Sequence, residues 1–236
     1  MTIDKRSLFV ILAHPDDESF SIGGTLAKYA AEGVRMTLIC ATKRELGIPN
    51  LSSEETGKIR QNELYVAAKV LGISDVRFLG YRDGELGSAN PHEIVYMLSA
   101  ILQTERPQAV VTFGPDGISG HPDHIAISQF VTKAVDQSGI KTHLYYIAPS
   151  DATFQGCGVP PPPEIAGGPV AGIDVEKYLV NKVRAMQCHA SQHPPYIGIA
   201  EEEATHLACH EYFTLVRPLF SVNSSNDLFI ESFIEG

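Results

Sequence analysis

The sequence predicts a single α/β domain built on a Rossmann-like, mostly parallel β-sheet flanked by helices. Short runs of branched apolar residues alternate with longer segments of helical periodicity, which is the order of parallel strands joined by right-handed crossovers. The chain has 236 residues, enough for one substantial core, and 44% of them are apolar, as is typical of soluble globular proteins. Because we find no internal repeat and no second domain, residues 1–236 are expected to form one domain.

The first expected strand is the run from Leu8 to Ala13, six small or apolar residues of the kind found in a central strand buried on both faces. It ends at His14-Pro15 because the proline ring removes a donor from the ladder. Other short apolar runs bounded by turn residues are also expected to be strands. The full set of expected strands is 8–13, 34–41, 76–79, 109–113, 143–147 and 212–216.

The segments between these strands carry apolar residues at helical spacing, and several have terminal signals. Gly33 and Gly72 stand where a helix ends, and Pro91 stands where a first turn tolerates proline. The expected helices run from about 23 to 33, 54 to 71, 91 to 104, from the residues after His124 to about 136, and from 175 to 189.

Residues 149–172 have a different composition, with several prolines and glycines, and are expected to form an extended loop without regular structure. Loops of this length in compact domains often form functional rims. Two roles are open for this loop, closure over a substrate or contact with a second subunit.

Composition and charge exclude several classes of partner. The formal net charge is -10 and the chain has no Lys/Arg run, so binding to nucleic acid or to an anionic membrane surface is not expected. No apolar run approaches the roughly 20 residues that a membrane-spanning helix needs. The four cysteines are scattered, which indicates neither a disulfide framework nor a zinc ribbon. With no signal-peptide pattern before the first strand, the expected location is cytoplasmic.

The first chemical cluster, His14-Pro15-Asp16-Asp17-Glu18, follows the expected central strand. It therefore lies at the carboxyl edge of the sheet, where open α/β sheets bind ligands. One imidazole with neighbouring carboxylates suits a divalent metal of borderline hardness and favours zinc. The alternative is local: Asp16 or Asp17 caps the next helix, Glu18 complements its dipole and His14 is an ordinary loop histidine.

The second cluster, His121-Pro122-Asp123-His124, follows the expected strand 109–113 after a long turn. A helix start is the alternative interpretation, with the proline in the first turn and the aspartate complementing the dipole. However, both clusters follow buried strands and so meet at the same sheet edge. His14, Asp17 and His124 then make a three-ligand set that leaves a fourth position for water, as in catalytic zinc sites.

The two clusters together resemble the paired signature of the LmbE-like, or PIG-L, family of zinc-dependent N-acetylglucosamine deacetylases. Ala13-His14-Pro15-Asp16-Asp17-Glu18 and His121-Pro122-Asp123-His124 stand at the separation usual in that family. The resemblance spans about residues 7–192, with weaker likenesses at Arg60 with Glu63, at 80–84, and from Lys182 to Gln192.

The resemblance implies the roles of the central residues. In the family, the positions of His14, Asp17 and His124 bind zinc, and the position of Asp16 is the general base. The division is chemically sensible, because a carboxylate beside the metal can take the proton of an activated water.

The resemblance implies roles for the surrounding residues as well. His121 matches a protonated histidine that stabilises the oxyanion and protonates the leaving amine, and Asp123 is expected to orient it and hold it charged. Arg60 and Asp83 match positions that contact substrate, although a surface ion pair with Glu63 is an alternative for Arg60.

One position departs from the pattern of family members that act on thiol-linked sugars. Those members have a tyrosine two residues before the second motif, where it polarises the amide carbonyl. Ser119 stands at that position here, so the oxyanion partner is expected to come from elsewhere.

The sequence thus predicts a metal-dependent hydrolase of a carbon–nitrogen amide bond, most simply a deacetylase of an N-acetylated amino sugar or its conjugate. The alternatives are an amidase acting on a larger acyl group or a thiol conjugate, and a non-catalytic metal-binding or sugar-binding module. A nucleotide-dependent oxidoreductase is disfavoured because no G-x-G-x-x-G joins a strand to a helix. The expected cofactor is Zn²⁺, with Fe²⁺ left open, and the expected partner is a small N-acetylated sugar; homo-oligomerisation is also left open.

Overall fold

The computed structural model describes residues 6–148, 170–192, 208–217 and 225–229. Within these ranges, seven strands form one sheet in the order β3-β2-β1-β4-β5-β7-β6. Strands β1 to β5 run parallel to one another, whereas β7 runs antiparallel to both β5 and β6. The expected mostly parallel sheet is therefore confirmed. Its strands are β1 (Ser7–Leu12), β2 (Arg35–Thr42), β3 (Asp75–Tyr81), β4 (Ala109–Phe113), β5 (His143–Ala148), β6 (Val170–Asp174) and β7 (His210–Arg217).

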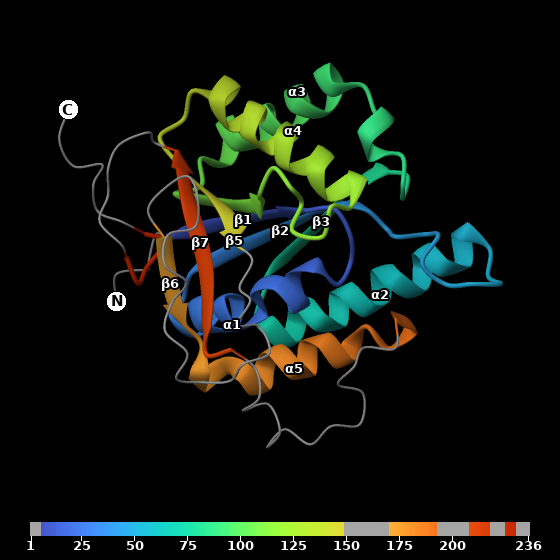
Figure 1. Cartoon of the computed structure of the whole chain (residues 1–236), viewed down its shortest axis with the longest axis horizontal. Coiled ribbons are helices and arrows are strands. Elements are labelled where there is room, and N and C mark those ends of the chain that lie inside the picture. Colours follow the sequence, from blue (N-terminus) through green and yellow to red (C-terminus); the bar gives the residue numbers. More distant parts are fainter. Residues whose placement is uncertain (1–5, 149–169, 193–207, 218–224, 230–236) are drawn as a thin grey trace.

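Helices cover both faces of this sheet, as Figure 1 shows: α3 and α4 lie on one side, and α1, α2 and α5 lie on the other. Every residue of β1 is buried between these layers, as its unbroken apolar run predicts. The five expected helices are confirmed with small shifts at most ends. The helices are α1 (Asp17–Ala31), α2 (Ser53–Leu71), α3 (Pro91–Glu105), α4 (Pro122–Ser138) and α5 (Leu179–Cys188).

The order of the strands creates a switch point beside β1. The chain passes from β1 to β2 and β3 on one side, and then crosses back to place β4 on the other side. The loops that leave β1 and β4 therefore diverge, and the crevice between them is where open α/β sheets bind ligands. Both histidine-carboxylate clusters follow these two strands.

The first helix differs most from its expected bounds. It begins at Asp17 rather than near Gly23, and its backbone is non-helical at Ile22 (φ -139°, ψ 21°). The amides of Gly24 and Thr25, just after this break, donate to the carboxylate of Glu211 at 3.1 and 2.7 Å. A side chain of the distant strand β7 therefore holds the break in α1.

Strand β6 corrects the expected loop 149–172, because residues 170–172 belong to the sheet. The run Val-Ala-Gly-Ile-Asp has a glycine at its centre and no unbroken apolar stretch, so its sequence signal is weak. A Cβ at Gly172 would lie 3.1 Å from the ring of Tyr212 on β7, which explains the small residue at this position. Residues 149–169 lie outside the described residues.

Among the helices of the described ranges, none combines the length and apolar character needed to cross a bilayer. Cys40 and Cys188 are free thiols. Cys209 is disulfide-bonded, which the scattered spacing of the cysteines does not indicate.

The buried ion pair between Lys182 and Glu211 (2.6 Å) ties α5 to β7. Replacing Glu211 with glutamine leaves a buried ammonium without its partner, so we expect Glu211→Gln to lower the free energy of unfolding by roughly 3–5 kcal/mol. Urea unfolding followed by circular dichroism measures this loss. Glu54→Gln, which breaks the exposed pair with Lys58, is the matched control and should leave the midpoint unchanged. Similar midpoints for the two variants would contradict the expectation.

Candidate active site

The side chains of His14, Asp17 and His124 gather at the switch point between β1 and β4. Nδ1 of His14 lies 3.1 Å from Nε2 of His124. One carboxylate oxygen of Asp17 lies 3.3 Å from the same nitrogen of His124, and the other lies 3.9 Å from Nδ1 of His14. The structure therefore brings the three expected metal ligands together from the β1 loop, the start of α1 and the first turn of α4.

Hydrogen bonds on the far side of each ring determine where the protons lie. Nε2 of His14 is 3.2 Å from oxygens of both Asp83 and Asp123, so this nitrogen carries a hydrogen and donates it. Nδ1 of His124 likewise donates to the carbonyl oxygen of Gly117 at 3.1 Å. The nitrogens that face each other, Nδ1 of His14 and Nε2 of His124, are thus the ones left with lone pairs.

The two nitrogen lone pairs and the carboxylate of Asp17 repel one another unless a cation lies between them. The pKa of His14 is consistent with a bound proton: burial alone would lower it, but the carboxylates of Asp123, Asp83 and Asp17 raise it to about 9. Without a metal, a proton on Nδ1 therefore takes the position between the two rings. Two imidazole nitrogens and one carboxylate form a donor set that fits a divalent metal such as zinc.

His121 lies against the same cluster, with its ring centroid 4.8 Å from that of His14 and 5.0 Å from that of His124. Its Nδ1 accepts the backbone N–H of Asp123 at 3.2 Å, which caps α4. Burial, together with the neighbouring charges of His14 and His124, lowers the pKa of His121. A neutral ring with its hydrogen on Nε2 follows, in place of the charged ring expected from the sequence.

The carboxylate of Asp123 accounts for that difference. It accepts hydrogen bonds from the amides of Gly84 and Leu86 at 2.8 and 3.1 Å, and it contacts His14 rather than His121. The expected pairing of Asp123 with His121 is therefore wrong. Asp123 instead lies against His14, one of the expected metal ligands.

Asp16 occupies the N-cap position of α1 with a left-handed backbone (φ 109°), and its side chain makes no capping hydrogen bond. The capping alternative is therefore wrong for this residue. Its Oδ2 instead accepts from Arg60 at 2.8 Å, and its amide donates to Glu18 at 3.0 Å. Burial, and then the charge of Asp17, raise the pKa of Asp16 to about 6, although the positive charge of Arg60 opposes the shift.

Arg60 and Asp83, which the sequence predicts to contact substrate, both have protein partners in the structure. Arg60 is completely buried, and its guanidinium donates to Asp16, to Glu63 at 2.5 Å and to the carbonyl oxygen of Pro15. The alternative pair with Glu63 is present, but inside the protein rather than on the helix surface. The carboxylate of Asp83 is also buried and is held by His14 and by an amide of the β2 loop.

A second buried pair, absent from the expected site, lies behind Asp16. Oε1 of Glu18 lies 2.8 Å from Nε2 of His189, and both residues are inaccessible to solvent. Burial alone would lower the pKa of His189, but the negative charge of Glu18 outweighs this effect and raises it. His189 follows α5, so the relevant sequence signal is the weaker likeness between Lys182 and Gln192.

The turn before the second motif is shaped by Gly117 and leaves Ser119 beside His124. Gly117 has a φ of +66°, and a Cβ there would lie 2.8 Å from the Cβ of His124, so the turn requires glycine. The hydroxyl of Ser119 lies 3.4 Å from Nδ1 of His124. This is the nitrogen that faces away from the cluster, so Ser119 contacts the side of the His124 ring opposite His14 and Asp17.

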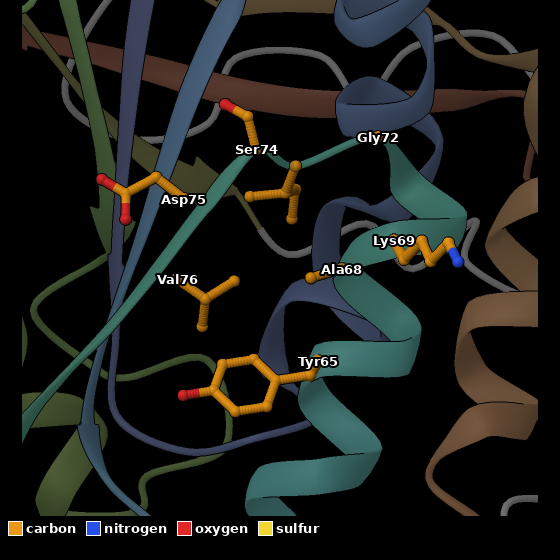
Figure 2. Close-up of a pocket in the computed structure, with 8 residues that line it drawn as sticks. Tyr65, Ala68, Lys69, Gly72, Ser74, Asp75 and Val76 are labelled. Atoms are coloured by element: carbon orange, nitrogen blue, oxygen red, sulfur yellow. The ribbon is translucent and has the colours of Figure 1, made fainter.

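A surface pocket of about 580 Å³ between α2 and the start of β3 is distinct from this site. Figure 2 shows Tyr65 and Ala68 on the side of α2 that faces Val76, whereas the side chain of Lys69 points away from β3. The pocket lies at the amino end of β3, whereas Asp83 follows the carboxyl end of that strand. It is therefore at the opposite edge of the sheet from His14.

Comparison with known proteins finds similar deacetylases. The family model described as PIG-L, GlcNAc-PI de-N-acetylase, matches residues 9–135. A 1D-myo-inositol 2-acetamido-2-deoxy-alpha-D-glucopyranoside deacetylase from Acidothermus cellulolyticus is 34% identical, over 90% of this chain and 89% of its own. The protein named Probable N-acetyl-alpha-D-glucosaminyl L-malate deacetylase 2 from Bacillus anthracis is 31% identical, over 80% of this chain and 82% of its own.

Solved structures show the same fold at lower identity. The N,N'-diacetylchitobiose deacetylase from Pyrococcus horikoshii superposes with a TM-score of 0.67 at 23% identity, covering 90% of this chain and 84% of its own. The 4-carboxy-2-hydroxymuconate hydratase GalB from Pseudomonas putida superposes with a TM-score of 0.65 at 18% identity, covering 92% and 99%. Because this fold carries both reactions, the activity of this chain has to be argued from its site.

The raised pKa of His14 predicts how metal binding depends on pH. Below about pH 9 the metal-free protein holds a proton on the ring that the metal has to displace. We expect the affinity for Zn²⁺ to rise about tenfold per pH unit from pH 6.5 towards 9, and then to level off. Competition against a chromophoric chelator at several pH values measures it. An affinity independent of pH over this range would contradict the proposed protonation.

Proposed function

The chain belongs to the PIG-L family of GlcNAc-PI de-N-acetylases, and on that basis we propose that it removes the acetyl group from an N-acetylated amino sugar conjugate by metal-dependent hydrolysis. The observation that carries this proposal is the pair of facing nitrogens, Nδ1 of His14 and Nε2 of His124, 3.1 Å apart beside Asp17. Because the far-side nitrogens of both rings are engaged as donors, the two facing nitrogens are the ones available to a metal. We further propose that residues 1–236 act as one deacetylase domain.

His14, Asp17 and His124 are the proposed metal ligands, and zinc is the proposed metal. The same set of two imidazoles and one carboxylate also suits Fe²⁺, which makes iron the alternative. When bound, the metal supplies Lewis acidity, which polarises a carbonyl group and makes a water molecule more acidic. The remaining chemistry is assigned to protein side chains.

Asp16 is the proposed general base. Burial raises its pKa to about 6, which brings the carboxylate near the pH at which a base is most effective. Arg60 on α2 donates a hydrogen bond to this carboxylate, and the backbone amide of Asp16 donates to the carboxylate of Glu18. In the proposed reaction, Asp16 takes a proton from the attacking water and later gives that proton to the departing amine nitrogen. The hydroxyl group that remains of the water forms a bond to the carbonyl carbon and the C–N bond breaks. The products are acetic acid and the free amine, which ionise in water to acetate and the ammonium form.

His121 is the proposed hydrogen-bond donor to the oxyanion. Its Nδ1 is occupied by the amide of Asp123, which leaves the hydrogen of Nε2 free to donate. A neutral imidazole in this position stabilises negative charge as it develops on the carbonyl oxygen. In this proposal Asp123 and Asp83 orient His14 and Arg60 orients Asp16, so none of the three contacts the reacting atoms.

Acetate release from N-acetylated amino sugar conjugates tests the proposed function. We expect release from protein of known zinc content, and loss of release after chelation, because the side chains alone lack the Lewis acid. Readdition of zinc should restore activity. Release of a longer acid from acyl analogues but not of acetate would instead favour the larger-acyl amidase. Absence of turnover on every conjugate would favour a binding module.

Two substitutions separate the metal ligands from the base. We expect Asp16→Asn to retain zinc while kcat falls by about 10²–10⁴-fold, because the proton acceptor is lost. We expect His124→Ala to lose zinc, because one of three ligands is gone. Elemental analysis and acetate release measure the two effects. His121→Ala is the control from within the histidine cluster and should keep its metal; equal zinc loss in all three variants would contradict this assignment.

A further inference from the structure

Arg44 lies in the turn after β2, and both sides of this turn are anchored at the candidate active site. The amide and hydroxyl of Thr42 donate to the carbonyl oxygen of Ala13 at 2.9 and 3.1 Å, immediately before His14. The amide of Leu46 donates at 3.2 Å to Asp83, which itself contacts His14. The backbone of Arg44 is therefore fixed at the rim of the metal cluster.

The local conformation around Arg44 is unusual. Its φ is +48°, a left-handed conformation that favours glycine. The turn therefore holds an arginine where glycine, which has no Cβ, has less backbone strain. A Cβ at Gly47 would lie 3.0 Å from Cγ of Arg44, so the glycine leaves room for the arginine side chain. Strain of this kind in a non-glycine residue is typical of functional positions.

The guanidinium of Arg44 has no carboxylate partner among the described residues, and its Nε is buried without a hydrogen bond. Two neighbouring cations, Arg60 and Lys43, do have partners. Arg60 is held by Asp16 and Glu63, and the ammonium of Lys43 lies 5.8 Å above the ring of Phe78.

The charge of Arg44 nevertheless reaches the site. Its positive charge acts to lower the pKa values of four groups, which come from the loops after β1, β3 and β4. Arg44 is thus within electrostatic range of groups on all three loops, and its turn is tied to two of these loops through Ala13 and Asp83. The four groups are His14, Asp16, Asp83 and His121.

We propose that Arg44 binds an anionic group, a carboxylate or a phosphate, on the part of the substrate attached to the amino sugar. This inference rests on the proposed deacetylase function and specifies its substrate class as negatively charged N-acetylglucosaminyl conjugates. The planar guanidinium presents paired donors that match carboxylate and phosphate oxygens. Such a cation is needed because the surrounding carboxylates, and a chain of formal net charge -10, otherwise repel an anionic substrate.

The relatives supply matched probes. Their names refer to an inositol conjugate, whose second half is neutral, and to an L-malate conjugate, whose second half carries carboxylates. N-acetylglucosamine 1-phosphate adds a phosphate probe. With zinc-loaded protein, we expect kcat/KM for acetate release to be higher for the anionic probes than for the inositol conjugate. Whether kcat/KM is higher for the malate conjugate or for N-acetylglucosamine 1-phosphate shows whether the site prefers a carboxylate or a phosphate.

Arg44→Asn and Arg44→Gly remove the charge with residues that tolerate a left-handed backbone, so folding is preserved. We expect the ratio of kcat/KM for the malate conjugate over the inositol conjugate to fall about tenfold or more, mainly through KM. Arg44→Lys should recover part of the ratio. Lys43→Met, which removes the neighbouring cation, is the matched control and should keep the ratio of the unmodified protein.

The outcomes separate this inference from the proposed function. Acetate release with an unchanged ratio, or an equal loss on both conjugates, overturns the role of Arg44 and leaves the deacetylase proposal standing. Calorimetric titration in an Asp16→Asn background needs no turnover and tests binding alone. Weaker binding of the malate conjugate after Arg44→Asn, without a matching change for the inositol conjugate, supports the anion site even if the reaction proves to be different.

Discussion

The hydrogen bonds from Nε2 of His14 to Asp83 and Asp123 are the constraint on which the site depends. They tie the loop after β1 to the loops after β3 and β4, each at 3.2 Å. Because the hydrogen is fixed on Nε2, Nδ1 is left to face His124 and Asp17. Asp123 is held in turn by two amides of the β3 loop. The orientation of His14, a proposed metal ligand, is thus set by backbone groups that hold its partner Asp123.

Asp16, the proposed base, is held by a separate network of hydrogen bonds. Asp16 has a left-handed backbone at a cost of about 1–3 kcal/mol, which the surrounding structure has to offset. Arg60 stabilises this conformation by donating to the carboxylate of Asp16 and to the carbonyl oxygen of Pro15. Glu18 accepts a hydrogen bond from the backbone amide of Asp16. His189 supports Glu18 from the end of α5. Two helices that lend no group to the proposed reaction, α2 and α5, therefore position the base.

The sequence predicts where His14, Asp17 and His124 meet because their loops follow strands whose apolar runs are unmistakable. It predicts the partners of Asp123 and Arg60 poorly, for a physical reason. The partner that a carboxylate contacts depends on how separate loops close, and the first turn of α4 directs Asp123 across the switch point to His14. Arg60 does lie on the inward face of α2, as its spacing suggests, but its exposure depends on α5 covering it from more than a hundred residues away.

The fold divides in the same way, into elements that local sequence patterns predict and elements that depend on contacts between distant segments. Strands β1 to β5 follow from local apolar runs, and the ends of α2 follow from a capping box at Ser52 and from Gly72. The break in α1 and strand β6 depend on β7, through Glu211 and through strand pairing. Local patterns therefore identify the groups that do the chemistry, whereas contacts between distant segments fix their protonation and direction. Arg44 belongs to the second kind, because the lack of a carboxylate partner for its guanidinium within the described part of the chain depends on how the loops around it are tied together.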